Sequence, residues 1–128
     1  MLNEVKTQVY QLISGLGYNC TDNGVYRENF PWLMLRTKGH TLRTSLDLRY
    51  DVITFDLDIF STYAGEQEVI DIVDNIANHL DDLRAVNPNI TAIAQTTMKI
   101  IPDKETGPVK KHGIVTYRIM LTSGKEVL

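Results

Sequence analysis

Between residues 50 and 84, the hydrophobic positions change from a two-residue repeat to a helical one. Every second residue from 53 to 59 is hydrophobic, and the residues between them are polar: Thr54, Asp56 and Asp58. This alternation predicts a strand with one dry face and one wet face. From 69 to 83 the hydrophobic residues recur at spacings of three and four, which predicts an amphipathic helix. A two-faced strand followed by such a helix predicts a sheet that is covered on one side only.

The same patterns, together with turn residues, predict the other elements. In chain order we expect a helix at 2–15, a short strand at 32–37 that ends at Lys38-Gly39, the strand and helix of 50–84, and strands at 90–101 and 113–121. Residues 38–47 stay open, because Thr41–Leu48 fits either an extended strand or a loop. Residues 102–112 contain two prolines and many charges, which predicts a solvated loop.

These elements predict an α+β protein with the order α-β-β-α-β-β. Two helices pack on one face of a mostly antiparallel sheet of four to five strands. We expect the last two strands to form a hairpin around the charged loop. The strand–helix–strand unit of 50–101 makes a right-handed crossover if its two strands are parallel neighbours. At 128 residues the chain is long enough to be a single domain, 1–128, with its own hydrophobic core.

Composition excludes several classes of protein. The net charge of −3 gives no basis for sequence-independent binding to nucleic acid. A single cysteine, Cys20, excludes an internal disulfide framework. No hydrophobic run approaches the roughly 20 residues that span a bilayer, and the first residues lack the pattern of a secretory signal. We therefore expect no membrane partner and a protein that is made in the cytoplasm.

Four aspartates form the densest acidic cluster and the main candidate for chemistry: Asp47, Asp51, Asp56 and Asp58. Carboxylates two positions apart on a strand share a face, as a Mg²⁺ site requires. A polar strand surface that meets water or a neighbouring subunit explains the same residues without an ion. The histidines and Cys20 lack the spacing of a zinc site, and the glycines form no phosphate-binding loop. We predict no catalytic residues, metal or cofactor, and keep a small metal-dependent enzyme using this cluster as the alternative.

The uncovered face of the predicted sheet is the stronger candidate for function. It is lined by Thr54, Asp56, Asp58, Thr116 and Arg118. Such a face can meet water, as in a monomeric binding module, or a neighbouring copy through mixed charges. Two segments are candidate docking loops that order on a protein partner: 38–47, with Lys38 and His40, and 102–112, with Lys104, Lys110, Lys111 and His112.

Taken in order, several stretches carry a resemblance to a known family. After the helix of 2–15 they are PWLML at 31–35, YDVITFDLDIFS at 50–61, TYAGEQE at 62–68, VIDIVDNIANHL at 69–80 and HGIVTYRIML at 112–121. Together they resemble the tail terminator or tail-to-head joining proteins of long-tailed bacteriophages, the group with the lambda tail terminator fold. The resemblance extends over essentially the whole chain.

The resemblance implies a structural virion protein that caps the tail tube as a ring, commonly of six subunits. Its partners would be further copies of itself, the tail tube protein and a head completion or connector protein, but no sequence-specific nucleic acid. It would lie at the head-proximal end of the tail after assembly in the host cytoplasm. Asp56 and Asp58, with Thr54 and Arg118, would form a subunit contact or line the DNA channel, where acidic groups repel the duplex. A head–tail connector or minor capsid protein is the alternative within the same class.

Overall fold

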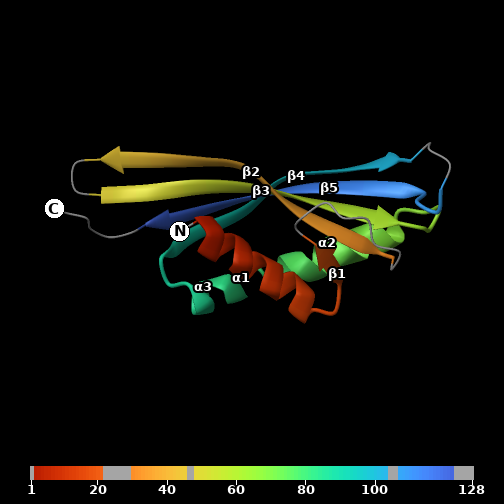
Figure 1. Ribbon diagram of the computed structural model, residues 1–128, viewed down its shortest axis with the longest axis horizontal. Coiled ribbons are helices and arrows are strands. Elements are labelled where there is room, and N and C mark those ends of the chain that lie inside the picture. Colours follow the sequence, from red (N-terminus) through yellow and green to blue (C-terminus); the bar gives the residue numbers. More distant parts are fainter. Residues whose placement is uncertain (1, 22–29, 46–47, 104–106, 123–128) are drawn as a thin grey trace.

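The computed structural model describes residues 2–21, 30–45, 48–103 and 107–122. Helices cover one face of a five-stranded sheet, which gives two layers (Figure 1). In chain order the elements are α1 (Leu2–Gly15), β1 (Asn19–Thr21), β2 (Trp32–Ser45), β3 (Leu48–Ser61), α2 (Gln67–His79), α3 (Asp82–Val86), β4 (Ile90–Pro102) and β5 (Lys111–Thr122). The predicted α+β class and its order of main elements are confirmed, and β1 and α3 are additional short elements.

The sheet has the strand order β1-β2-β3-β5-β4. β1 pairs with β2 in parallel, and every other neighbouring pair is antiparallel. The expected hairpin of the last two strands is therefore confirmed. β3 and β4 run in the same direction, but β5 lies between them. The connection through α2 and α3 consequently passes over one strand instead of joining two neighbours.

The hydrophobic core lies between the helices and the inner face of the sheet. Ile53, Phe55, Leu57 and Ile59 of β3 are fully buried there, as the two-residue repeat predicts. Helix α1 buries Val5, Val9 and Ile13, and α2 buries Val69, Ile72, Val73 and Ile76. On β5, Gly113 lies opposite Ile59, and a Cβ added there would overlap the Val69 side chain. This glycine therefore lets α2 pack directly against the backbone of β5.

Strand β2 is longer than the sequence predicts. It continues past Lys38-Gly39 to Ser45 and pairs with β3 along its length, with a register shift between Thr37 and Gly39. Residues 38–45 are therefore strand, while 46–47 lie outside the described residues. The end of β2 and the start of β3 extend past the helix layer (Figure 1). Without helices to cover them, these residues need no hydrophobic alternation. The pattern therefore left strand and loop open, and the described residues follow the extended alternative.

The second predicted helix is interrupted. α2 ends at His79 and α3 begins at Asp82, and the turn between them is closed by a bond from the Leu83 amide to the Leu80 carbonyl of 3.1 Å. Leu80 and Leu83 are both buried on the core side. The hydrophobic spacing thus continues through the interruption, which explains why the sequence pattern shows one helix. None of the described helices is long and hydrophobic enough to cross a membrane.

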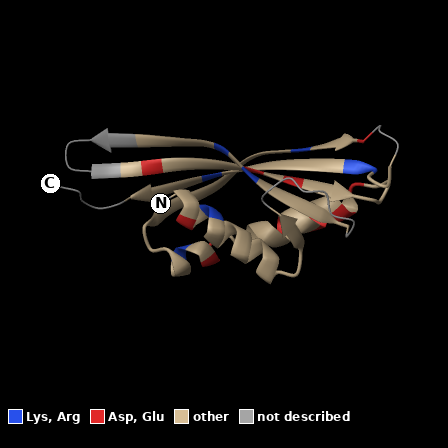
Figure 2. Cartoon of the chain, viewed as in Figure 1, with Lys and Arg blue, Asp and Glu red and all other residues tan. Residues whose placement is uncertain are grey.

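Acidic and basic residues occur on both strands and helices (Figure 2), but the exposed ones are divided between the two layers. Among the described residues, the exposed acidic side chains all belong to the helices or the turns beside them: Glu4, Glu66, Asp71, Asp74, Asp81 and Asp82. Apart from Arg84, the exposed Lys and Arg of the same residues lie on strands or at their ends: Arg36, Lys38, Lys99, Lys110 and Arg118. One layer is consequently acidic at its surface and the other basic.

Candidate interaction surface on the uncovered sheet face

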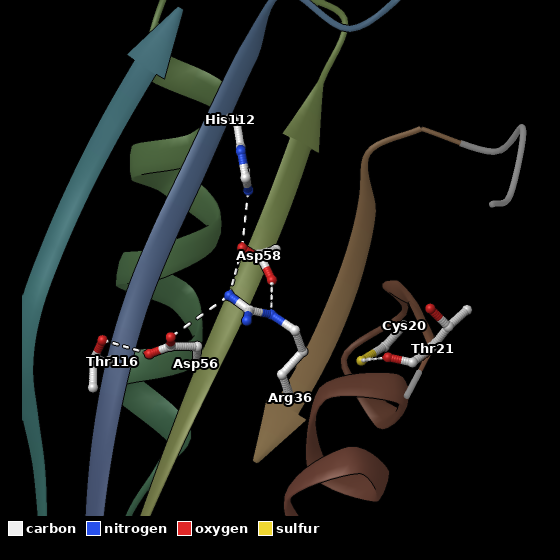
Figure 3. A network of polar contacts seen from close by, with 7 residues as sticks. All are labelled: Cys20, Thr21, Arg36, Asp56, Asp58, His112 and Thr116. Atoms are coloured by element: carbon white, nitrogen blue, oxygen red, sulfur yellow. Dashed lines mark hydrogen bonds and ion pairs between the residues drawn. The ribbon is translucent and has the colours of Figure 1, made fainter. Parts of the chain in front are cut away.

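A network of polar side chains from three adjacent strands lies on the sheet face opposite the helices (Figure 3). Arg36 of β2 donates from Nε to Asp58 Oδ2 at 2.5 Å and from Nη2 to Asp58 Oδ1 at 3.3 Å. His112 of β5 places Nε2 2.9 Å from the same Oδ1 atom. Thr116 Oγ1 donates to Asp56 Oδ1 at 2.6 Å, and Arg36 Nη2 lies 3.6 Å from Asp56 Oδ2. The two carboxylates of β3 are thus held from both sides.

The strand register explains why these side chains meet. Asp56 lies opposite Arg36 on β2 and opposite Thr116 on β5, so all three point to one face. His112 lies opposite Phe60, two positions from Asp58 along β3, and reaches Asp58 diagonally. The network follows from pairing β3 with both neighbours at this register.

The carboxylates of this network are buried although no second layer covers them. Asp58 is 2% exposed and Asp56 is 8% exposed. Burial alone would raise the pKa of Asp58, but the hydrogen bonds from His112 and Arg36 and the charge of Arg36 outweigh it, so this pKa lies below its usual value. The hydrogen bond to Asp58 in turn raises the pKa of Arg36. The negative charge of Asp58 is therefore compensated inside the subunit.

An aromatic stack borders the network. The rings of Trp32 and Phe60 are 4.7 Å apart, and those of Phe60 and His112 are 4.5 Å apart, both in stacked orientation. Trp32 Nε1 donates to Thr21 Oγ1 of β1 at 3.0 Å. The stack fixes the plane of the imidazole whose Nε2 faces Asp58. Side chains of β1, β2, β3 and β5 are thereby joined into one rigid surface.

The residues predicted to line this face do lie on it, but three of them, Asp56, Asp58 and Thr116, are buried. Thr54 pairs with Arg118 in register, and Arg118 is exposed. Asp56 and Asp58 were expected to be wet, and this expectation is wrong because Arg36, His112 and Thr116 cover them. Their use as a subunit contact or as a channel lining stays a prediction.

The two candidate docking loops differ from their predicted form. Lys38 and His40 belong to strand β2, and His40 Nε2 lies 2.8 Å from Asp51 Oδ1. Lys110 precedes β5, with its amide bonded to the Ser61 carbonyl, whereas Lys111 and His112 are part of β5. Lys104 lies outside the described residues. The described part of 38–47 is therefore a strand arm, and the loop of 102–112 is shorter than predicted.

The acidic cluster that suggested a metal site is divided by the pleat of β3. Asp51 belongs to the face of Ile53 and is buried, whereas Asp56 and Asp58 point to the opposite face. Asp47 lies outside the described residues. Within the described ranges, no group of three or more His, Cys, Asp or Glu side chains is arranged to hold a metal ion. The metal-dependent alternative thus loses the convergence of carboxylates on which it was based.

Sequence reasoning missed Arg36 and the role of His112. Arg36 follows Trp32 and Met34 at two-residue steps, which places it on the uncovered face of its strand. That signal gives the face but not the partner, because the register between strands depends on contacts distant in sequence. His112 was assigned to the loop, since nothing in its neighbours marks the start of β5.

A cavity of about 540 Å³ opens near the start of α2, on the helix side of the molecule. Its wall is formed by Tyr18, Pro31, Tyr63, Gly65, Gln67, Glu68, Asp71 and Ile72. Glu68 is held by a hydrogen bond from Ser61 Oγ, and Asp71 by one from Gln67 Nε2. No pattern along the chain indicated this cavity.

One family of known proteins matches most of the chain. The family model described as "Tail completion protein gp17" matches residues 7–122. The match begins within α1 and reaches the end of β5, so it includes the complete sheet with its polar network. Among curated proteins, none matches the chain.

Proposed function

Because this chain belongs to the tail completion protein gp17 family of phages, we propose that it caps the head-proximal end of the tail tube as a ring of six copies and provides the surface on which the head docks. Family membership confirms the resemblance found in the sequence and makes the chain a phage tail-assembly protein. It also supports a structural role in the virion, and we propose no enzymatic activity.

The observation that carries the ring proposal is the rigid, uncovered sheet face. Its polar side chains are already fixed by hydrogen bonds and stacking within the subunit. A surface that is ordered before it binds loses little conformational entropy on association. A solvated face of a monomer has no need of such order. The arrangement therefore favours contact with a protein partner over contact with water alone.

The shape of the sheet supports two further docking sites. The end of β2 and the start of β3 lie at one end of the long axis of the molecule, and the end of β4 and the start of β5 lie at the other (Figure 1). We propose that one end meets the tail tube protein and the other meets the head completion or connector protein. Lys38 and His40 belong to the first end, and Lys110 and Lys111 to the second.

The internal compensation of Asp56 and Asp58 bears on the choice between channel lining and subunit contact. A lining that repels DNA needs carboxylates whose field reaches the channel. Here each carboxylate is buried and bonded to groups of the same subunit. We therefore propose that this face is a subunit contact, in which Thr54 and Arg118 also take part.

Deletion of the gene from its phage, followed by electron microscopy of the lysate, tests the proposed function. Overlong tails would support termination of the tube, and tails of normal length beside unjoined heads would support a joining or connector role. Complementation by the wild-type gene on a plasmid serves as the control. Complete virions in normal number without the gene would refute a role in tail completion.

A further inference from the structure

We propose that neighbouring copies of this chain associate head to tail, with the acidic helix surface of one copy on the basic sheet face of the next. The acidic helix surface comprises Glu66, Asp71, Asp74, Asp81 and Asp82, and the basic sheet face comprises Arg36, Lys99 and Arg118. The inference rests on the ring that forms part of the proposed function and names the two surfaces that build it.

On the sheet face, the cations are at the surface and the anions are beneath it. Lys99 and Arg118 are exposed, and the side chain of Arg36 is 48% exposed even though it binds Asp58. Lys99 and Asp58 both lie opposite Ile114, one on either side of β5, so they share this face. A partner that arrives at the sheet thus meets mainly the charges of Lys99 and Arg118, because Asp56 and Asp58 are buried and paired with Arg36.

On the helix surface, the charge has the opposite sign. Asp71 and Asp74 lie one turn apart on the exposed side of α2, opposite the side that is buried in the core. Asp81 and Asp82 extend the acidic surface to α3, where Arg84 lies 3.9 Å from Asp81 as the one exposed cation of the described α2–α3 segment. This distribution follows from amphipathic helices whose polar positions are nearly all acidic.

Because the two layers carry opposite charge, contact between the helix surface of one copy and the sheet face of another is favoured over contact between like faces. Two copies that met through identical faces would place like charges against one another, which is costly. Contact between unlike faces is heterologous, and its repetition gives a ring if the rotation closes. Met34 and Ile114, both half-buried on the sheet face, and the exposed Ile101 of β4 add apolar surface between the cations. A second copy of this chain therefore fits both surfaces at once.

Charge reversal on each surface, alone and in combination, tests this geometry. The first variant carries Asp71→Lys and Asp74→Lys, and the second carries Lys99→Glu and Arg118→Glu. We expect each alone to raise the dissociation constant of self-association at least about tenfold, because the substituted side chains on one surface then face side chains of the same sign on the neighbouring copy. Mixed in equal amounts, the two variants should assemble in alternation, because each supplies the surface that complements the other. Multi-angle light scattering after size exclusion gives the mass, and circular dichroism shows that each variant is folded.

A chain with all four substitutions keeps the net charge of −3 and serves as the matched control. It should assemble with itself within about threefold of the wild-type dissociation constant, but not with the wild-type chain. Wild-type-like assembly of either single-surface variant, or no recovery on mixing, would overturn the head-to-tail contact while leaving the ring of the proposed function intact. A wild-type chain that stays monomeric at all concentrations would overturn both the contact and the ring.

Discussion

Side chains of the two strands next to β3 cover the carboxylate of Asp58 and bond to it. The alternation of β3 predicts instead that this carboxylate is exposed. The side chain of Asp58 is 3% exposed, and Arg36 and His112 both bond to it. Alternation along one strand correctly gave the face on which Asp58 lies. It gave neither its burial nor its partners, because these come from side chains 22 and 54 positions away in sequence.

Substitution of Asp58 by Asn should lower the free energy of unfolding at pH 7 by about 1.5–3 kcal/mol, the usual contribution of hydrogen bonds to a charged group. Because the pKa of Asp58 is lower in the folded protein, the unfolded chain binds the proton first. Its stabilising effect is complete above the ordinary value of about 4 and is lost as the pH falls through the folded pKa.

Urea unfolding at a series of pH values measures this effect. The variant should lose less stability than the wild type as the pH is lowered below about 4, where the carboxylate of Asp58 takes up its proton. Asp74→Asn, at an exposed position of α2, is the control and should follow the wild-type curve. Equal acid sensitivity in Asp58→Asn and wild type would show that the network does not hold Asp58 ionised.

Gly113 is the residue on which the contact between α2 and β5 depends. Gly113→Ala should destabilise the protein by about 1–3 kcal/mol, because the new methyl group overlaps Val69 in a packed core. Gly39→Ala is the control, since a Cβ there meets nothing within 4 Å. Thermal unfolding distinguishes the two. Equal melting temperatures would mean that α2 shifts freely away from the sheet.

The elements that bury a regular hydrophobic stripe were the most predictable. Helix α1 and strand β5 begin and end within two residues of their expected positions, and each buries such a stripe. The arm formed by the end of β2 has no such stripe, and the bulge after Thr37 disturbs the alternation. Polar pairing holds this arm, and a contact between two strands cannot be inferred from either alone.

The arm is stabilised by the bond between His40 and Asp51, whose side chains are 31% and 1% exposed. Removal of the imidazole by His40→Ala leaves a buried carboxylate without this partner, which costs about 1–3 kcal/mol. We expect amide hydrogen exchange in His40–Leu42 to accelerate at least about tenfold, with little change in β4 and β5. Thr41→Ala, at the exposed position that follows His40 in β2, is the control. Uniform acceleration across the sheet would contradict a local effect.

On the scale of the whole molecule, the small net charge of −3 conceals two surfaces of opposite sign. Among the described residues, the exposed charged side chains of the helix layer are mainly acidic, and those of the sheet are basic. The acidic residues and the lysines are evident along the chain, but their order does not place them on opposite surfaces. That assignment required the strand order and the side of the sheet on which α2 and α3 lie (Figure 2). The uncovered face of the sheet was predictable, because alternating hydrophobic and polar residues along a strand directly indicate a face without a hydrophobic cover.

Self-association should weaken as salt is added. An increase from about 0.1 M to 1 M NaCl shortens the Debye length from about 10 Å to about 3 Å and screens the attraction between exposed groups. We expect the dissociation constant of the wild-type chain to rise at least about tenfold, as measured by sedimentation velocity. The chain with all four charge reversals should show the same dependence. Association that strengthens with salt would instead indicate a mainly hydrophobic contact.

Trp32, the single tryptophan of the chain, offers a built-in optical probe. It is 6% exposed and stacks on Phe60 of its own subunit, so its fluorescence arises from a dry site. Unfolding carries the indole into water and shifts its emission to longer wavelength, whereas a neighbour that docks on the exposed cations keeps the already buried indole out of water. The wavelength of maximum emission therefore reports unfolding, and the scattered intensity of the same sample reports the loss of assembly.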